Sequence, residues 1–208
     1  MNRLAILGAS GHGKVVADSA EHAGWKEIVF YDDAWPKCGT NGAWDVVGDT
    51  KALLSKLSQY DGVIIAIGDN HTRLKKHTEL ITHGASLVSI VHPGAQISQY
   101  VELGIGSVVM AGAIINVDSK LGASCIVNTG ATIDHDCVLG DGVHISPGAN
   151  LSGAITIGDA SWVGVGASIR QLVSIGKNAV IGAGAVVVSN VQDFQTVVGV
   201  PARELVQK

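Results

Sequence analysis

The sequence predicts a two-part fold: a small parallel α/β sheet over residues 1–90, followed by a three-sided parallel β-solenoid over residues 91–208. Before residue 91, short apolar segments alternate with helical patterns, which is typical of βαβ units. From Val91 to Gln192 the chain divides without a break into seventeen six-residue units, and each unit begins with Val, Ile or Leu. A period of six fits neither a helix nor a pleated strand, whose side-chain periods are about 3.6 and 2.

Each six-residue unit combines one large and one small apolar position. The fifth position is Ala, Ser, Cys or Val in every unit except one, where Ile155 takes it. We expect the first position to fill a triangular prism, the fifth to lie inward beside a corner, and the third and fourth to form the bend. Three units then make one coil, so the repeat predicts nearly six coils stacked at the strand spacing of about 4.8 Å. Glycine at the second or fourth position suits a bend that needs positive φ or close backbone approach.

Composition excludes several classes of protein. Lys and Arg number 14 against 18 Asp and Glu, and the net charge of −4 argues against a nucleic-acid or polybasic membrane binder. A hydrophobic share of 47% excludes disorder, while neither an apolar run of transmembrane length nor a signal-peptide pattern is found. The three cysteines lack metal-ligand spacing, and Cys125 and Cys137 occupy fifth positions, where we expect small core residues. These features predict a cytoplasmic protein with free thiols.

The first ninety residues show the alternating strands and helices of a parallel sheet. Strands are expected at residues 3–7, 27–31, 62–66 and 86–90. Helices are expected at residues 15–23, at residues 51–57 with Thr50 as the N-cap, and from Asn70 to His83.

The glycine-rich segment Gly8–Lys14 leaves several interpretations open. Its order G-x-x-G-x-G differs from the dinucleotide fingerprint G-x-G-x-x-G. It matches the P-loop pattern G-x-x-x-x-G-K, but Val15 stands where a Mg²⁺-binding Ser or Thr is required. A third interpretation is a mononucleotide or nucleotide-sugar site, with glycine amides facing a diphosphate and Asp32 and Asp33 facing sugar or base. A tight strand–helix turn without a ligand remains the fourth, and His12 either approaches the phosphates or caps its helix.

Three groups of residues resemble a known family. The hexad pattern and the ending Val198–Arg203 are similar to the left-handed parallel β-helix of hexapeptide-repeat acyltransferases. The segment GASGHG after the first strand, Asp-Asp after the second and Ala-Ile-Gly-x-Asn after the third resemble bacterial sugar acetyltransferases of the PglD/NeuD type, with a Rossmann-like N-terminal domain. The segment Asn128–Asp141 is closely similar to that family's Asn-Thr…Ile-Glu-His-Glu-Cys-x-Ile-Gly segment. The resemblance covers essentially the whole chain.

This resemblance implies an acetyl-CoA-dependent N-acetyltransferase. The implied acceptor is the 4-amino group of a UDP-linked 4-amino-4,6-dideoxy-N-acetyl-hexosamine of the bacillosamine type, acetylated by direct transfer in a ternary complex. The implied assembly is a homotrimer with three sites between subunits. Two alternatives remain: an O-acetyltransferase acting on sialic acid or a related sugar, and a non-catalytic trimeric scaffold that binds nucleotide sugar.

The family's general base corresponds to His135, which stands at the third, corner position of its unit. An imidazole titrates near neutral pH without help, which suits acceptance of a proton from an ammonium. Asp136 corresponds to the acidic residue that follows the family histidine, and with Asp134 it is a candidate to orient the ring. Asp is one methylene shorter than the Glu of some relatives.

The remaining candidate residues fall into two groups. The expected substrate-binding residues are Gly11, His12, Gly13, Asp32, Asp33, Gly68 and Asn70. The expected acetyl-CoA-binding residues are Asn128, His144, Gly153, Val165 and Ala183. His144 corresponds to a family histidine near the thioester and is expected to point outward from a flat face. A backbone N–H near Gly153 is a candidate for the oxyanion hole.

The histidines of the repeat do not favour a metal site. Some carbonic anhydrases of the same prism fold bind zinc through three histidines from different subunits. His92, His135 and His144 are the only histidines of the repeat, and their spacing differs from that pattern. The sequence therefore predicts acetyl-CoA as co-substrate and no metal. Trp162, at an outward sixth position, hints at an interface.

Overall fold

The computed structural model describes residues 3–205. It divides the chain into two compact units, with the boundary between Pro93 and Gly94. In the described part of the chain, no helix is long and apolar enough to cross a membrane.

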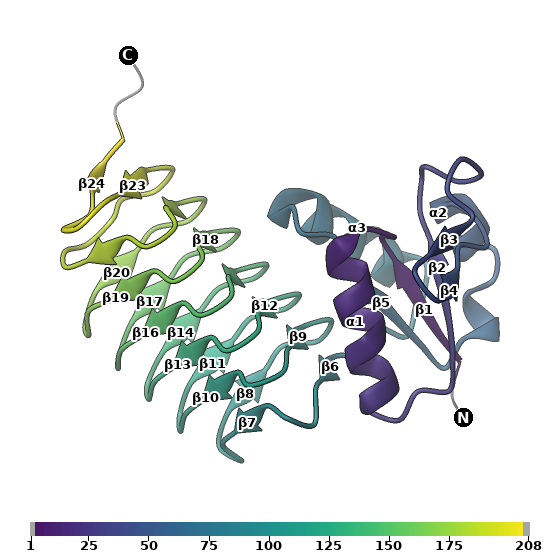
Figure 1. The fold of residues 1–208 in the computed structure, drawn as a ribbon, viewed down its shortest axis with the longest axis horizontal. Coiled ribbons are helices and arrows are strands. Elements are labelled where there is room, and N and C mark those ends of the chain that lie inside the picture. Colours follow the sequence, from purple (N-terminus) through teal and green to yellow (C-terminus); the bar gives the residue numbers. More distant parts are fainter. Residues whose placement is uncertain (1–2, 206–208) are drawn as a thin grey trace. The chain divides into compact units, whose positions relative to one another are not determined.

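The first unit contains a three-stranded parallel sheet in the order β2-β1-β5 (Figure 1). Its strands are β1 (Arg3–Leu7), β2 (Glu27–Tyr31) and β5 (Gly62–Ile65). Its helices are α1 (Gly11–His22), α2 (Thr50–Leu54), the 3₁₀ turn η1 (Leu57–Gln59) and α3 (Asn70–Thr82), and β3 (Thr40–Asn41) pairs with β4 (Trp44–Asp45) in an antiparallel ribbon. The chain passes from β1 to β2 on one side and then to β5 on the other. This reversal creates a switch point at the carboxyl ends of the strands, where parallel sheets bind ligands.

Some predicted boundaries in this unit are wrong. Helix α1 begins at Gly11 rather than Val15, so half of the glycine-rich segment forms the first helical turn. The N-cap of α2 is Asp49, whose carboxylate accepts a hydrogen bond from the Ala52 N–H at 2.8 Å, and Thr50 is already inside the helix. Of the expected strand at 86–90, only Ile90 lies in a strand, β6 (Ile90–Val91).

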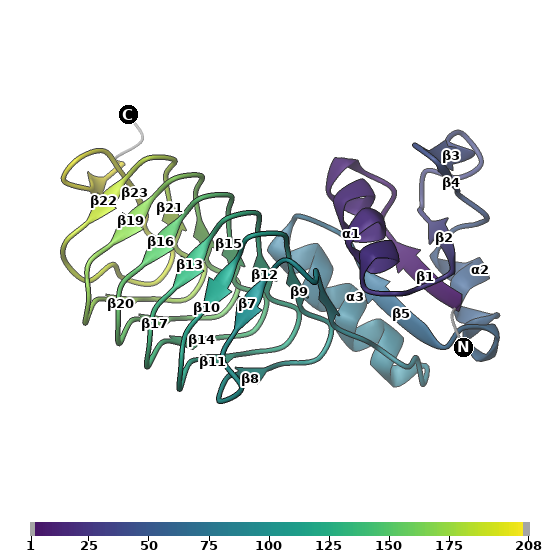
Figure 2. The same ribbon diagram turned by 60° about the horizontal axis from the view of Figure 1, so that its bottom comes forward.

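The second unit is a parallel β-solenoid with the three-sided coil that the hexad pattern predicted, and it is of the left-handed β-helix type that the resemblance implied (Figure 2). Strands 18 residues apart pair in register, as Ile114 does with Gln96 and with Thr132, so three hexads make one coil. Sheet I contains β7 (Gln96–Ile97), β10 (Ile114–Ile115), β13 (Thr132–Ile133), β16 (Asn150–Leu151), β19 (Ser168–Ile169) and β22 (Val186–Val187). Sheet II contains β8 (Glu102–Leu103), β11 (Lys120–Leu121), β14 (Val138–Leu139), β17 (Thr156–Ile157) and β20 (Ser174–Ile175). Sheet III includes β9 (Val108–Val109), β12 (Ile126–Val127), β15 (His144–Ile145), β18 (Trp162–Val163), β21 (Val180–Ile181), β23 (Thr196–Val198) and β24 (Arg203–Glu204).

Side chains in the coils occupy the predicted places. First-position aliphatics such as Ile133 and small fifth-position residues such as Ala131 are fully buried inside the prism. Positive φ occurs at the fourth position of the corners, both at glycines such as Gly130 and at other residues such as Asp136. Second-position glycines serve a different purpose, because a Cβ at Gly158 would overlap the backbone of the next coil. The two glycine positions therefore meet two separate steric demands.

We expect Gly158→Ala to destabilise the second unit by about 1–3 kcal/mol, because the added methyl forces neighbouring coils apart. Urea denaturation followed by circular dichroism measures this change. Gly130→Asn is the matched control: its corner has positive φ, which Asn tolerates, and no neighbouring atom lies within 4 Å of the place that a Cβ would take. Equal stability of the two variants would contradict the close-packing role of the second position.

Candidate functional site

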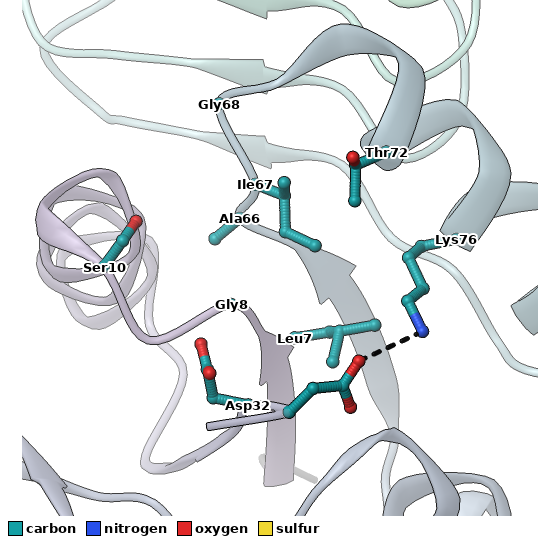
Figure 3. Close-up of a pocket in the computed structure, with 10 residues that line it drawn as sticks. Leu7, Gly8, Ser10, Asp32, Ala66, Ile67, Gly68, Thr72 and Lys76 are labelled. Carbon is teal, nitrogen blue, oxygen red and sulfur yellow. Dashed lines mark ion pairs between the residues drawn. The ribbon is translucent and has the colours of Figure 1, made fainter. Parts of the chain in front are cut away.

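A cavity of about 360 Å³ opens at the switch point of the first unit (Figure 3). The carboxyl ends of all three strands line it, together with two side chains from α3. Its lining residues are Leu7, Gly8, Ser10, Asp32, Asp33, Ala66, Ile67, Gly68, Thr72 and Lys76. Gly8 has φ of +114° and a Cβ there would overlap the Ala66 carbonyl, so only glycine fits between β1 and β5.

Both predicted acidic residues of this cavity are already hydrogen-bonded within the chain. The Asp32 carboxylate accepts the N–H groups of Ala9 at 2.7 Å and Ala34 at 2.8 Å. The Asp33 carboxylate accepts the Thr50 N–H at 2.9 Å and pairs with the Lys76 ammonium at 3.4 Å, the dashed line of Figure 3. Burial acts to raise the pKa of Asp33, but the bonds from Thr50 and the charge of Lys76 hold it below its ordinary value. The Asp33 carboxylate thus stays ionised, and the hydrogen bonds of both carboxylates fix the loops that shape the cavity.

The other predicted substrate residues lie around this cavity rather than in its lining, except for Gly68. Gly11, His12 and Gly13 form the first turn of α1, and Gly13 is packed so closely on Gly8 that a side chain would collide with its carbonyl. Asn70 is buried and its side-chain oxygen accepts a hydrogen bond from Arg73 at 2.8 Å.

Arg73 is a residue of this site that the sequence analysis missed. It is 1% exposed, and its guanidinium donates to the carbonyls of Ile67 at 2.9 Å and Gly68 at 3.0 Å. These bonds fix the β5–α3 connection, which lines the cavity. Burial, and then the positive charge of Arg73, lower the pKa of His12 to about 4. His12 is therefore neutral at pH 7, and the N-cap of α1 is Ser10 instead.

In the second unit, His135 stands at the corner between β13 and β14. We call this prism edge, between sheets I and II, the His135 edge. The imidazole Nδ1 lies 2.7 Å from a carboxylate oxygen of Asp136, which has φ of +59°. This hydrogen bond, together with the charges of Asp134 and Asp136, raises the pKa of His135 above its ordinary value. Because the carboxylate accepts, Nδ1 carries the proton and Nε2 presents its lone pair.

Two neighbours hold the His135 corner in place. Asp134 accepts the His135 N–H at 2.9 Å and the Asn116 side-chain amide at 3.0 Å, so it fixes the backbone rather than the ring. Gly153 lies 18 residues on, directly under the imidazole, and a Cβ at that position would overlap the ring atoms. A cavity of about 420 Å³ at this corner is lined by Asp134, His135, Ser152, Gly153, Ala154, Gln171 and Leu172.

The other predicted acetyl-CoA residues follow a different edge, between sheets III and I, which we call the Asn128 edge. Asn128, Val165 and Ala183 all stand at corners that follow strands of sheet III, and Val165 and Ala183 are exposed. His144 lies on β15 in sheet III, beside this edge. Within one chain, the His135 edge and the Asn128 edge are separate edges of the prism.

The pattern predicted that His144 points outward from a flat face, and in the structure its ring is covered there rather than exposed. It is 6% exposed because Trp162, one coil on, stacks against its ring at 4.8 Å between centroids and an angle of 24°. The Asn128 side-chain oxygen accepts the Thr129 N–H at 2.9 Å, which turns the amide nitrogen toward His144 Nε2 at 3.3 Å. An amide donor makes Nε2 the acceptor, so the His144 proton resides on Nδ1.

Comparisons with known proteins agree with this architecture. A model of the PglD N-terminal domain matches residues 3–80. The acetyltransferase domain of PglB from Neisseria gonorrhoeae FA1090, solved with acetyl coenzyme A, is 43% identical with a TM-score of 0.95 over 99% of this chain and 100% of that one. PerB from Caulobacter crescentus, solved with CoA and GDP-perosamine, is 39% identical with a TM-score of 0.94 over 99% of this chain and 98% of that one. WeeI from Acinetobacter baumannii AYE is 32% identical with a TM-score of 0.90 over 99% and 100%.

The chain belongs to the PglD-type sugar acetyltransferases. It is therefore an acetyl-CoA-dependent sugar N-acetyltransferase, as the resemblance implied. Within residues 3–205, no cluster of three or more His, Cys, Asp or Glu side chains is arranged to hold a metal ion.

The 18-residue spacing of the coils indicates several residues of the site that the sequence analysis did not assign to it. Ser152, Ala154, Gln171 and Leu172 stand one or two coils after Asp134, Asp136 and His135, and Trp162 stands one coil after His144. Adding 18 or 36 to a candidate residue number finds them. Thr72 and Lys76, which line the cavity, and Arg73, which holds the β5–α3 connection, carry no such signal, because packing of α3 on the sheet places them.

We expect the unfolding free energy of the first unit to fall as the pH is lowered from about 6.5 to about 4. In this pH range His12 of the unfolded chain takes up a proton, whereas His12 of the folded chain stays neutral, since its pKa is lowered to about 4. The unfolding free energy lost across this pH range is on the order of 3 kcal/mol. His12→Gln should abolish this loss, as measured by urea denaturation at each pH. His83→Gln, at the exposed position just after α3, is the matched histidine-to-glutamine control.

Proposed function

We propose that this enzyme acetylates the 4-amino group of a UDP-linked 4-amino-4,6-dideoxy-N-acetyl-hexosamine, with His135 as general base. The observation that supports this most is the His135–Asp136 pair. At 2.7 Å, the pair directs the Nε2 lone pair away from Asp136, at a corner cavity large enough for an acceptor sugar. Asp136 also raises the affinity of the imidazole for a proton, which suits the uptake of one from an ammonium near neutral pH.

The proposed transfer is a single displacement. The sugar amine attacks the thioester carbonyl carbon of acetyl-CoA, a C–N bond forms, and the negative charge moves to the carbonyl oxygen. His135 Nε2 takes the ammonium proton, the C–S bond breaks, and that proton passes to the departing sulfur. The products are the acetamido sugar and free CoA. The Gly153 N–H is our candidate donor to the oxyanion, because Gly153 lies directly beside the imidazole.

Direct transfer is favoured over an acyl-enzyme by the state of the nearest thiol. Cys137 follows the catalytic pair in sequence, but its side chain points into the prism and is fully buried. Burial raises the pKa of the Cys137 thiol, and its Sγ donates to the Ser152 carbonyl at 3.3 Å. A buried, protonated thiol is a poor nucleophile.

A homotrimer explains why the candidate residues of one chain are divided between two edges. Three prisms around a three-fold axis would bring the His135 edge of one copy against the Asn128 edge of the next. Three sites would result, each with His135 from one subunit and Asn128, His144, Val165 and Ala183 from its neighbour. Trp162, which is 39% exposed, and the exposed Val165 are apolar groups that such contacts would cover.

The switch-point cavity of the first unit is our candidate for the nucleotide. PerB was solved with a GDP-linked sugar, so GDP is the competing nucleotide for our UDP assignment. Because acetyl-CoA is a cytoplasmic metabolite, we place the reaction in the cytoplasm.

Release of free CoA thiol from acetyl-CoA tests the proposal. We expect release with a UDP-linked 4-amino-4,6-dideoxy sugar, less with the GDP-linked analogue, and none with sialic acid. His135→Asn should keep the trimer by light scattering and lower kcat by about 10²–10⁴-fold. Release with sialic acid alone would favour O-acetylation, and no release with any acceptor would favour a binding scaffold. Full activity of His135→Asn would remove this residue from the mechanism.

The pH profile gives a second test. A neutral His135 is the active form, so kcat should fall as the pH drops through its raised pKa. Asp136→Asn removes the largest cause of that shift, so the acidic limb of the profile should move to lower pH. Asp118→Asn is the matched control, at the equivalent positive-φ corner one coil earlier. An unmoved acidic limb in Asp136→Asn would contradict the assigned pairing.

A further inference from the structure

Leu172 is an anomaly of the corner pattern. Its side chain is 75% exposed and its backbone has φ of +61°. At the other positive-φ corners between residues 106 and 184 stand only Gly, Ala, Ser, Asp or Asn, which adopt this conformation more readily or are small. In a single chain, leucine at this place is neither buried nor in a favourable backbone conformation. Strained, exposed apolar residues of this kind concentrate where a ligand or partner is bound.

The place of Leu172 connects it with the chemistry of His135. Leu172 belongs to the coil that follows Gly153, and its N–H donates to the Gly153 carbonyl at 3.1 Å. The two side chains of Leu172 and His135 line one cavity, of about 420 Å³, on the His135 edge. Of the other lining residues, Asp134, Ser152 and Gln171 are polar and Gly153 and Ala154 are small, so Leu172 is the large apolar side chain of this cavity.

The acceptor that we assign carries an apolar group close to its reacting nitrogen. In a 4-amino-4,6-dideoxy pyranose, the amine is on C4 and the methyl group is on C5, so three bonds separate nitrogen from methyl carbon. When His135 takes a proton from the amine, the methyl group must lie within a few bond lengths of the imidazole. A sugar with a hydroxyl at C6 would place that hydroxyl in the same spot.

We propose that Leu172 contacts the C6 methyl group of the acceptor and selects 6-deoxy sugars over sugars with a C6 hydroxyl. This inference rests on the proposed function. Contact between leucine and a methyl group removes apolar surface from water. A hydroxyl buried against leucine loses its bonds to water without replacement. Discrimination of this kind against an added hydroxyl reaches about 10- to 100-fold in kcat/KM.

The test compares two acceptors that differ only at C6: a UDP-linked 4-amino-4,6-dideoxy sugar and its counterpart with a C6 hydroxyl. We expect the wild-type enzyme to prefer the 6-deoxy sugar and Leu172→Asn to lower this preference about ten-fold, mainly through kcat/KM of the 6-deoxy substrate. Asn tolerates positive φ, so the corner keeps its shape. Phe194→Asn is the matched control, since Phe194 is also exposed, has φ of +62° and does not line the cavity.

Each other outcome overturns the assignment in a distinguishable way. An unchanged preference in Leu172→Asn, with activity retained, overturns the role of Leu172 and leaves the proposed function intact. Loss of the trimer by light scattering, with both acceptors slowed equally, shows that a second copy of the chain covers Leu172 instead. A wild-type enzyme that acetylates neither sugar overturns the proposed function and the assignment of Leu172 together.

Discussion

The backbone ladder between successive coils is the constraint on which the second unit depends. The Asp134 N–H donates to the Leu151 carbonyl at 3.0 Å, and one coil later the Ser152 N–H donates to Ile169 at 3.1 Å. Each residue therefore has its lateral neighbour 18 positions away. His135 can lie over position 153 only because that residue is glycine, so the same register that closes the ladder also places the imidazole.

The ladder explains why so much of this unit could be predicted from sequence. Aliphatic residues every six positions can be buried together only in a three-sided coil, so the pattern alone specified both sheets and corners. The neighbouring positions of Trp162 and His144 follow from the same 18-residue spacing, but the burial of His144 by Trp162 does not. A sixth-position side chain points outward in the pattern, yet the indole is wide enough to cover the imidazole. Side-chain size, rather than register, decides burial on the outer faces.

The first unit was less predictable because its contacts are not periodic. The order of strands and helices could be inferred from apolar segments, but the start of α1 and the cap of α2 depended on single residues. Asp49 and Thr50 are both good caps, and the carboxylate that reaches the Ala52 N–H determines which one is used. Likewise, the buried Arg73 looks like a surface residue of a polar helix in the sequence. Only the packing of α3 on the sheet turns its guanidinium toward the Ile67 and Gly68 carbonyls.

Three histidines of this chain show how surroundings set the role of one side chain. Burial and the charge of Arg73 lower the pKa of His12 to about 4, so its imidazole is neutral at pH 7 in this structure. Asn128 and Trp162 hold His144 in one tautomer and one plane, with its Nε2 lone pair already taken up by the Asn128 amide. His135 is exposed at a corner and paired with Asp136, which raises its affinity for a proton. Of the three, His135 alone combines an available lone pair with a carboxylate that stabilises the imidazolium, and a general base requires both.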